Sequence, residues 1–407
     1  MSDAATAEAI HAAVAALGPG ALDEASLREH IHPLFTRVLQ GSGERVYLAN
    51  HSLGRPLDAM EADVREALAP WYSHPGSTWE TWRDEMQAYR ARLAELLGVA
   101  HADTVVPKTS AGQGLRAVLN TWNERVRVVA TRGEFDSMDV ILREYARRGR
   151  IALELVDARS DGLFAADDLH AAIARGADLV VLSPILFHTG QRLPALPALV
   201  RAAHAVGALV LLDVYHALGV IDVDIAALDA DFAIGGSYKY LRGGPGACFL
   251  YVDPRHLERG LRTLDIGWFA KENPFDYDRP DPPRYARGGD AWLESTPPVL
   301  PWYQARSGQV FTRAIGVERL RAFNLGQQRR LVALLAEQGI AAVGGTVDRG
   351  AFAVVRDTRA RAWAAALRDA GVIVDARGEW LRLCPDVLTT AAELERAALT
   401  LGRIVRG

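Results

Sequence analysis

Cysteine, an excess of basic residues and long apolar runs are scarce or absent in this chain of 407 residues, and each absence excludes a class of protein. The two cysteines, Cys248 and Cys384, lie far apart and form no CxxC pair, so neither a disulfide framework nor a zinc–thiolate site is predicted. A reducing compartment fits such a chain, and we expect a cytoplasmic protein. Lys plus Arg number 46 against 50 Asp plus Glu, a net charge of −4, which argues against a nucleic-acid partner.

No membrane segment is expected either. The first 18 residues contain Asp3 and Glu8 but no Lys or Arg, unlike a signal peptide. Apolar runs such as 208–212 are far shorter than the roughly 20 residues needed to span a bilayer. What remains is an ordinary globular composition, 49% hydrophobic and 24% charged, in a chain long enough for two or three units of roughly 150 residues.

The middle of the chain alternates short apolar runs with amphipathic stretches, the rhythm of βαβ units. Runs that are apolar at consecutive positions suit strands buried on both faces of a parallel sheet. Seven strands are predicted, at Thr104–Val106, Val126–Ala130, Ile151–Val156, Leu179–Leu182, Ala208–Leu212, Phe232–Ile234 and Ala247–Val252. The fold class is therefore α/β, with a mostly parallel seven-stranded sheet between helices such as 167–175 and 196–206.

The composition changes over 276–301, where six prolines and the pair Gly288-Gly289 predict a long loop. After it, helices are predicted over 309–323, 327–338 and 359–370, and short strands over 340–343, 351–355, 372–374 and 381–383. We therefore expect an N-terminal helical segment over 1–45 that joins the small domain, a large domain over 46–300, and a small α+β domain over 301–407.

The clearest chemical motif is GGSYKYLRGGPG, residues 235–246, between two apolar runs. Its Lys239 stands at a strand exit among glycines, which let a ligand approach the backbone closely. A lysine that is partly desolvated has a lowered pKa and becomes a nucleophilic amine, suited to Schiff-base chemistry. The plainer alternative is a solvated loop lysine beside a flexible hinge.

Asp213 ends another buried run, 208–212. An acid at the carboxyl end of a parallel strand is well placed for function, although it can merely cap the next helix. A carboxylate that faces a pyridine nitrogen keeps this nitrogen protonated, as pyridoxal 5′-phosphate (PLP) requires in order to act as an electron sink. Asp213 and Lys239 therefore suit the same cofactor.

Two further segments fit a flat cofactor that carries a phosphate. Thr109 and Ser110 precede the helical run 115–122, where backbone N–H groups and the helix dipole can hold a phosphate. On their own, such residues are more often simple N-caps. Phe135 follows another strand and can stack on a planar ring, although an aromatic residue there is more often part of the core.

These segments, in this order, resemble the kynureninases, a family in the class-V aminotransferase group of fold-type-I PLP enzymes. The resemblance runs from about Tyr47 to Pro385, and its most specific motif is SYKYL, residues 237–241. It also includes NHSLGRP at 50–56, Glu134-Phe135, Thr189–Gln191, Asp213 with His216, Gly267–Phe269, Pro297-Pro298 and Leu381–Leu383. It implies the fold-type-I PLP-dependent transferase fold and PLP as the cofactor.

The resemblance also implies roles for single residues around PLP. Lys239 forms the Schiff base, Asp213 pairs with the ring nitrogen, His216 lies near the phenolic oxygen, and Phe135 stacks on the ring. The expected phosphate contacts are Thr109 and Ser110, with Tyr238 close by and Trp268 reaching in from the partner subunit. Thr296, which stands where the family has Asn before Pro297-Pro298, is a further expected contact. Family membership thus implies a homodimer with its active site at the subunit interface.

Two residues are expected to bind the substrate. Arg382 matches the arginine that holds the substrate α-carboxylate, a task for which a planar guanidinium is suited. The alternative is an exposed strand arginine. His74 roughly matches a histidine near the family's substrate pocket, although a histidine in a Pro-Gly turn is usually structural.

The sequence also departs from the family. Met138 stands where the family has Asp, with Asp136 and Asp139 nearby. Arg242 and Lys271 stand where the family has Asn and His, and they suggest a more acidic substrate side chain, although Lys271 is equally explained as a surface charge.

The resemblance implies hydrolytic cleavage of the β,γ carbon–carbon bond of kynurenine or a related L-amino acid, with alanine as one product. Lys239 is then the base at the α-carbon and Tyr238 the acid at the γ-carbonyl. Transamination, β-elimination and C–S lysis on the same fold stay open. A desulfurase needs a cysteine on a mobile loop, and Cys384 in a strand-like run argues against one. A non-enzymatic PLP-binding protein is disfavoured because the chain lacks a DNA-binding extension.

Overall fold

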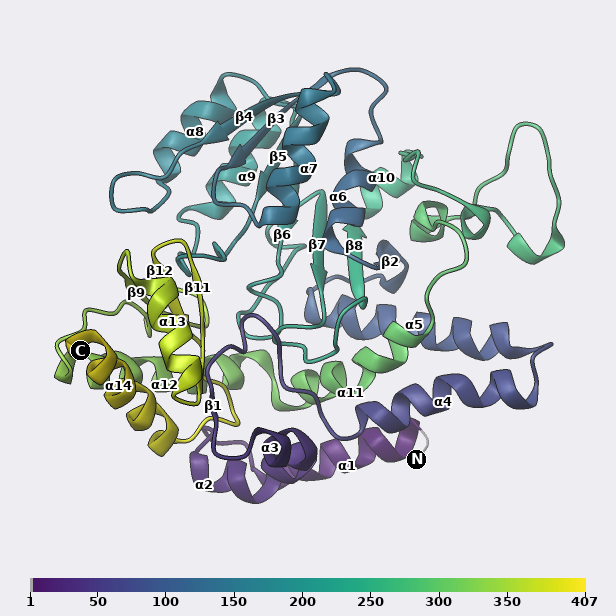
Figure 1. Cartoon of the computed structure of the whole chain (residues 1–407). Helices are drawn as coiled ribbons and strands as arrows, with labels where there is room; N and C mark the ends of the chain where they lie inside the picture. Colours follow the sequence, from purple (N-terminus) through teal and green to yellow (C-terminus); the bar gives the residue numbers. More distant parts are fainter. Residues whose placement is uncertain (1–2) are drawn as a thin grey trace.

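The computed structural model describes residues 3–407, and a seven-stranded sheet forms its centre (Figure 1). The strand order is β2-β8-β7-β6-β5-β3-β4, and β8 runs antiparallel to both of its neighbours while the other pairs are parallel. The strands are β2 Val105–Lys108, β3 Val126–Thr131, β4 Ile151–Val156, β5 Leu179–Leu182, β6 Leu209–Asp213, β7 Phe232–Gly236 and β8 Cys248–Val252. The seven predicted strands and the α/β class are therefore confirmed, with strand ends shifted by two residues at most.

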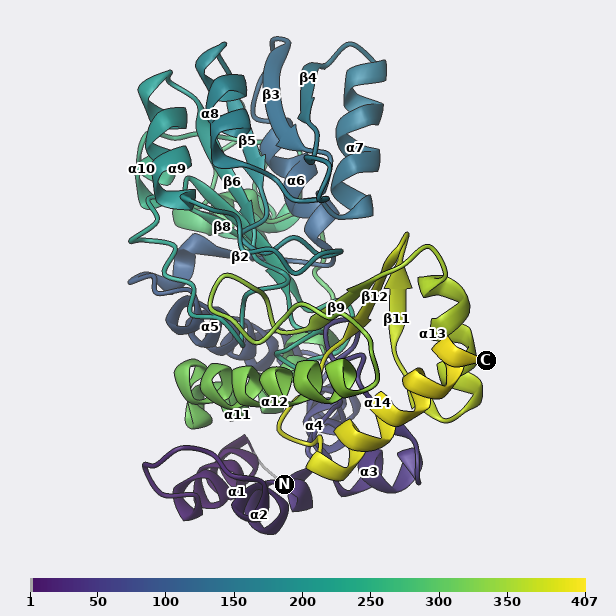
Figure 2. The ribbon, with the colours of Figure 1, turned by 90° about the vertical axis from the view of Figure 1, so that its left-hand side faces the viewer.

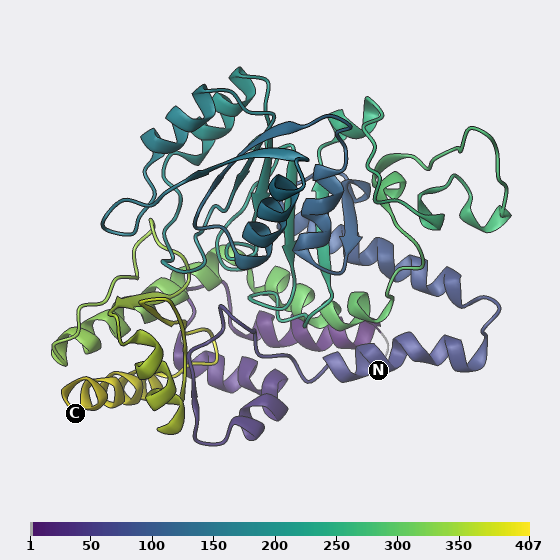
Figure 3. The same cartoon turned by 45° about the horizontal axis from the view of Figure 1, so that its top comes forward.

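Helices cover both faces of this sheet (Figures 1 and 3). One face packs against α6 Ala111–Leu119 and α7 Asp136–Arg147, and the other against α5 Thr78–Leu96, α8 Ala166–Ala174 and α9 Leu196–Ala205. Alternate residues of β5 pack on opposite faces. Leu179 and Val181 join the apolar cluster on the side of α6 and α7, and Val180 and Leu182 join the cluster on the side of α5, α8 and α9. Because successive strand residues point to opposite faces, burial on both sides explains why these strands are apolar at every position.

Smaller strands lie beside the large sheet (Figure 2). They form an antiparallel sheet in the order β11-β12-β9 and a parallel pair of β1 with β10. Their bounds are β1 Val46–Tyr47, β9 Ala353–Arg356, β10 Val372–Ile373, β11 Asp375–Arg377 and β12 Trp380–Leu383, and the helices packed against them are α13 Ala360–Asp369 and α14 Ala391–Arg406. Residues 46–47 thus pair with the C-terminal part of the chain, and the domain boundaries at 45/46 and 300/301 stay predictions.

The N-terminal segment packs against a long helix, α11 Leu300–Ile315, through apolar residues such as Ile10, Ile31 and Phe35. This segment contains α1 Asp3–Ala16, α2 Glu24–Ser26, the π-helix η1 Leu27–Ile31, the 3-10 helix η2 His32–Phe35 and α3 Thr36–Ser42. Next, α4 Met60–Ser73 and α5 form a helical hairpin that projects from the body (Figure 1). No helix within residues 3–407 has both the length and the apolar character that crossing a bilayer requires.

The helices after the proline-rich loop differ from the prediction. The expected helices 309–323 and 327–338 are in fact α11 and α12 Val317–Glu337, because the break lies at Gly316, with a φ of 91°, whereas Gly326 continues inside α12. Pro301, predicted as loop, lies in the first turn of α11, where its missing N–H is no loss. The predicted strand 340–343 is wrong: Val343 makes only an isolated bridge. The remaining short helices are α10 Pro254–Glu258, η3 Ala102–Thr104, η4 Trp268–Ala270, η5 Pro274–Asp276 and η6 Gly288–Trp292.

Candidate active site

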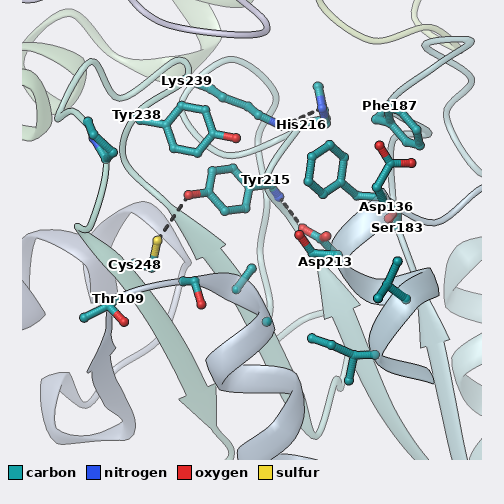
Figure 4. Close-up of a pocket in the computed structure, with 18 of the residues that line it drawn as sticks. Thr109, Asp136, Ser183, Phe187, Asp213, Tyr215, His216, Tyr238, Lys239 and Cys248 are labelled. Atoms are coloured by element: carbon teal, nitrogen blue, oxygen red, sulfur yellow. Dashed lines mark hydrogen bonds between the residues drawn. The ribbon is translucent and has the colours of Figure 1, made fainter. Parts of the chain in front are cut away.

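A cavity of about 560 Å³ lies at the carboxyl ends of β3, β5, β6 and β7 (Figure 4). Carboxyl ends of parallel strands meet at one edge of a sheet, so residues far apart in the sequence converge here. The lining includes Thr109, Ser110, Gly112, Arg116, Phe135, Asp136, Ser183, Phe187, Asp213, Tyr215, His216, Tyr238, Lys239 and Cys248. The structure thus brings together seven of the residues predicted for cofactor binding.

Lys239 is buried at the cavity wall, with 4% of its surface exposed. Its Nζ lies 2.6 Å from Nε2 of His216. Burial lowers the pKa of Lys239 to about 7, although the nearby Asp213 carboxylate acts in the opposite direction. At neutral pH a large share of this amine is therefore neutral and nucleophilic, and the solvated-loop alternative is wrong.

The chain contains only three lysines, and the other two do not line the cavity. Lys108 is buried and pairs with Glu294 at 3.0 Å. Lys271 donates a hydrogen bond to the backbone carbonyl of Asp278. Within one chain, any chemistry in this cavity that needs a lysine side chain therefore depends on Lys239.

Asp213 is the last residue of β6 and is also buried, with 4% exposed. Its Oδ1 accepts a hydrogen bond of 3.0 Å from the backbone N–H of Tyr215. Burial raises the pKa of Asp213, while the Tyr215 N–H and the Lys239 ammonium act to lower it. A desolvated carboxylate of this kind is stabilised by a cationic N–H partner placed in the cavity.

His216 also lines the cavity and lies next to the Lys239 amine. Burial lowers the pKa of His216 well below its usual value, and the Lys239 ammonium lowers it further, so the ring is neutral. Its Nδ1 is buried and has no hydrogen-bond partner within residues 3–407. A buried ring nitrogen without a partner is a place where a bound molecule gains a hydrogen bond.

Aromatic rings surround the Lys239 amine on several sides (Figure 4). Nζ lies 4.7 Å from the ring centroid of Tyr215, 5.2 Å from that of Phe135 and 5.6 Å from that of Tyr238. Phe135 contacts Phe187 edge-on, with centroids 5.2 Å apart. These walls suit a flat, conjugated ring.

The N-terminus of α6 forms another part of the wall. The Ser110 side chain caps this helix by accepting from the N–H of Gln113 at 3.1 Å, and the N–H and hydroxyl of Thr109 both donate to Gln113 Oε1. Both residues are exposed and line the cavity, and Ser110 is the N-cap of α6, as the simpler alternative predicted. The free N–H groups and dipole of this helix still suit a phosphate. With the amine, the acid and the aromatic walls, the residues present fit PLP.

Four predicted site residues do not line this cavity. Trp268 stacks on Tyr277 and donates its indole N–H to the carbonyl of Pro274 at 2.6 Å. Thr296 and His74 are exposed, and His74 ends α4 with Nδ1 2.9 Å from the Ser73 hydroxyl. The roles predicted for these three stay predictions.

Arg382 is the fourth of these residues. It is not the exposed strand arginine that was the alternative prediction, because only 2% of its surface is exposed. Its Nη1 donates to the carbonyl of Phe187, a residue that does line the cavity. Arg382 therefore stands directly behind the wall.

The structure also shows where the residues that differ from the family lie relative to the cavity. Met138 is fully buried in the core, while its neighbour Asp136 lines the cavity. Arg242 is buried away from the cavity and pairs with Asp386 at 2.8 Å. Within one chain neither Arg242 nor Lys271 lines the cavity, and the suggestion that they select a more acidic substrate stays a prediction.

Tyr215 is a cavity residue that sequence reasoning missed. Its hydroxyl lies 3.2 Å from Sγ of Cys248, which fixes the ring beneath the Lys239 amine. Gly236 makes this possible, because a Cβ there would lie 2.0 Å from the Tyr215 hydroxyl oxygen. In the sequence, Tyr215 lies between Asp213 and His216, which are both predicted site residues, and this position could have indicated its place in the cavity.

Glu134, next to Phe135, supports the cavity wall from behind. It is buried and accepts hydrogen bonds from the hydroxyls of Thr131, at 2.6 Å, and Ser183. Burial raises the pKa of Glu134 to about 7. Because Ser183 lines the cavity, Glu134 holds one of its polar groups in place.

This fold and this site together define a fold-type-I PLP enzyme, in which a desolvated lysine and a strand-end aspartate face one cavity at a helix N-terminus. Residues 57–384 match the family model described as aminotransferase class-V, and the chain belongs to that family. Membership confirms the predicted fold type and the predicted PLP cofactor.

Curated relatives are kynureninases, which confirms the resemblance seen in the motifs. The enzyme of Deinococcus radiodurans is 32% identical over 270 residues, which is 63% of each chain. The enzyme of Pseudomonas fluorescens is 28% identical over 386 residues, 88% of this chain and 89% of the other. Among solved structures, a variant of the cystine C–S lyase C-DES with glycine covalently linked to its PLP cofactor has a TM-score of 0.79 at 17% identity, covering 91% of this chain and 98% of that one. That likeness concerns the fold alone.

Proposed function

We propose that this protein is a kynureninase-like hydrolase, which cleaves the β,γ carbon–carbon bond of L-kynurenine or a related L-amino acid and releases alanine. The observation that supports it most is the match to kynureninases over most of the chain, combined with a cavity that keeps Lys239 nucleophilic beside Asp213.

The proposed cofactor contacts follow from the cavity. Lys239 would hold PLP through its amine, Asp213 would pair with the ring nitrogen, and Phe135 would stack on the ring. The N-terminus of α6, with Thr109 and Ser110, would hold the phosphate. Bound there, PLP supplies an electron sink for negative charge that develops at the substrate α-carbon.

The side chains of the cavity then account for the proton transfers. The amine of Lys239 would remove the α-proton of the bound substrate, a role for which a pKa of about 7 is suited. Burial raises the pKa of Tyr238, so its hydroxyl keeps its proton at neutral pH and donates it at the γ-carbonyl oxygen as water adds there. The β,γ bond breaks and the acyl group leaves as a carboxylic acid. The β-carbon takes up a proton, and Lys239 returns a proton to the α-carbon to give alanine.

A desulfurase-type reaction is disfavoured by both cysteines. Cys384 is buried beside β12, where its Sγ donates to the Ala351 carbonyl at 3.2 Å, and burial raises the pKa of its thiol. Burial also raises the pKa of Cys248 to about 11. Neither thiol is a mobile, ionised nucleophile.

We also propose that the protein is a homodimer in which Trp268 reaches the cavity of the other subunit. The segment that carries Trp268 projects from the body together with the α4–α5 hairpin (Figure 3), and Tyr277, stacked on Trp268, is largely exposed.

The assay for the proposed function is incubation of the PLP-loaded protein with L-kynurenine and with 3-hydroxykynurenine, read by mass spectrometry. Release of alanine and the matching anthranilate supports the proposal. Release of a keto acid indicates transamination instead, and no turnover of either compound contradicts the proposal.

Capture of PLP by the cofactor-free protein is expected to depend on pH near neutrality. Only the neutral amine attacks an aldehyde, and burial lowers the pKa of Lys239 to about 7. The rate should therefore fall roughly tenfold for each pH unit below that value and level off above it. Stopped-flow absorbance measures this rate. A rate that keeps rising to about pH 10, as for an ordinary lysine, contradicts the description of the site.

A further inference from the structure

Arg382 has a partner on the neighbouring strand. Asp375 on β11 lies directly opposite Arg382 in the antiparallel register of β11 and β12. Nε of Arg382 donates to Oδ1 of Asp375 at 2.7 Å, and Nη2 donates to Oδ2. Asp375 thus occupies the Nε/Nη2 edge of the guanidinium in a bidentate manner.

Asp375 is itself fixed from the opposite side by the segment before α4. Nε2 of the fully buried His51 lies 2.8 Å from Oδ1, and the Ser52 hydroxyl donates to Oδ2. Burial raises the pKa of Asp375, but the contacts from His51 and Arg382 outweigh this and hold it well below its usual range. The carboxylate is therefore charged, and it is anchored even without Arg382.

The same segment also contacts the backbone of Lys239. The N–H of Gly54 donates to the carbonyl of Tyr238 at 2.8 Å, and a Cβ on Gly54 would lie 1.9 Å from the carbonyl oxygen of Lys239. Residues 51–54 thus connect Asp375 with the segment that carries the amine.

The remaining contacts decide which edge of the guanidinium is available. One N–H of Nη1 donates to the Phe187 carbonyl. Nη2 also donates to the Ser52 hydroxyl, but at 3.5 Å this hydrogen bond is long and weak, so a carboxylate at the Nη1/Nη2 edge can replace it. With the Nε/Nη2 edge occupied, a further carboxylate can bind only through the Nη1/Nη2 edge.

We propose that Asp375 is a positioning residue, which together with His51 and Ser52 fixes Arg382 so that its Nη1/Nη2 edge receives the substrate α-carboxylate. The inference rests on the proposed function in one respect, namely that Arg382 binds an amino acid. One alternative is that Asp375 only fills the place of the substrate carboxylate and moves aside when substrate binds. The strand register and the contacts with His51 and Ser52 argue against this, because they hold Asp375 in place.

The test uses the PLP-loaded protein and the substitution Asp375→Asn, which keeps the shape of the side chain. The change in visible absorbance on adding L-alanine gives its Kd, and L-alaninol, which lacks the carboxylate, is the matched probe. We expect the Kd of L-alanine to rise about 10–100-fold, the range for losing hydrogen bonds to a charged group, and that of L-alaninol to stay within about twofold. The control is Asp357→Asn, which removes an exposed Asp357–Arg359 pair and should change neither value.

An unchanged or lower Kd for L-alanine overturns the inference, because it means that Asp375 only neutralises charge or competes for Arg382. An equal rise for both probes also overturns it, since a general structural role would affect both. If Asp375→Asn does not fold, Ser52→Ala should raise the Kd of L-alanine selectively by about 3–10-fold, and no change contradicts the inference. Failure of the proposed function is seen separately, as binding of L-alanine without cleavage of kynurenine by the unsubstituted protein.

Discussion

The substitution Lys239→Ala is expected to abolish the visible absorbance of the purified protein and to lower kynurenine turnover by at least about 10⁴-fold. It removes both the proposed attachment point of PLP and the proposed base at the α-carbon. No other lysine can take over, because Lys108 and Lys271 are held outside the cavity by Glu294 and by the Asp278 carbonyl. Absorbance spectra and single-turnover assays measure the two effects.

The control for this experiment is Arg201→Ala, which removes an exposed cation on α9 that does not line the cavity. It should leave the spectrum and the turnover within about twofold of the unsubstituted protein, as surface substitutions usually do. A Lys239→Ala protein that keeps its visible absorbance and its turnover would contradict the assignment of Lys239.

The substitution Asp213→Asn is expected to lower kcat by about 10²–10³-fold, the range for losing one preorganised electrostatic partner. An amide has the same shape but no charge, so it cannot hold the ring nitrogen of PLP in its protonated form. PLP should still bind, with a shifted absorption maximum. Steady-state kinetics with L-kynurenine and a spectrum of the same sample measure both.

The control for Asp213→Asn is Asp231→Asn, at another buried carboxylate beside the sheet. Asp231 accepts from the N–H of Val210 and contacts His204 and His256, away from the cavity. Its loss tests the general effect of removing a buried charge. Equal kcat values for Asp213→Asn and the unsubstituted protein would rule out a role for Asp213 at the cofactor.

The strands could be predicted from the sequence because each is buried on both faces, which leaves a short, continuous apolar run such as that of β5. The helices after the proline-rich loop could not be delimited in this way. Gly316 and Gly326 are equivalent in the sequence, but only Gly316 adopts the positive φ that ends a helix. The presence of a glycine therefore does not by itself show where a helix ends.

The core of the site could be predicted because Asp213 ends one strand and Lys239 closely follows another, and the carboxyl ends of parallel strands converge. The support of Arg382 could not, since His51 and Asp375 are separated by more than 300 positions and meet only through the fold. Tyr215 was missed for a different reason. A buried tyrosine usually belongs to the core, and only its contact with the Lys239 amine assigns it to the cavity.

The most direct measurement is to treat the PLP-loaded protein with sodium borohydride, digest it and locate the reduced cofactor by peptide mass spectrometry. Because the chain has three lysines, only three lysine side chains can carry the reduced cofactor. We expect the added mass on Lys239 and on neither Lys108 nor Lys271. Modification of another lysine, or of none in a protein that has bound PLP, would contradict the account.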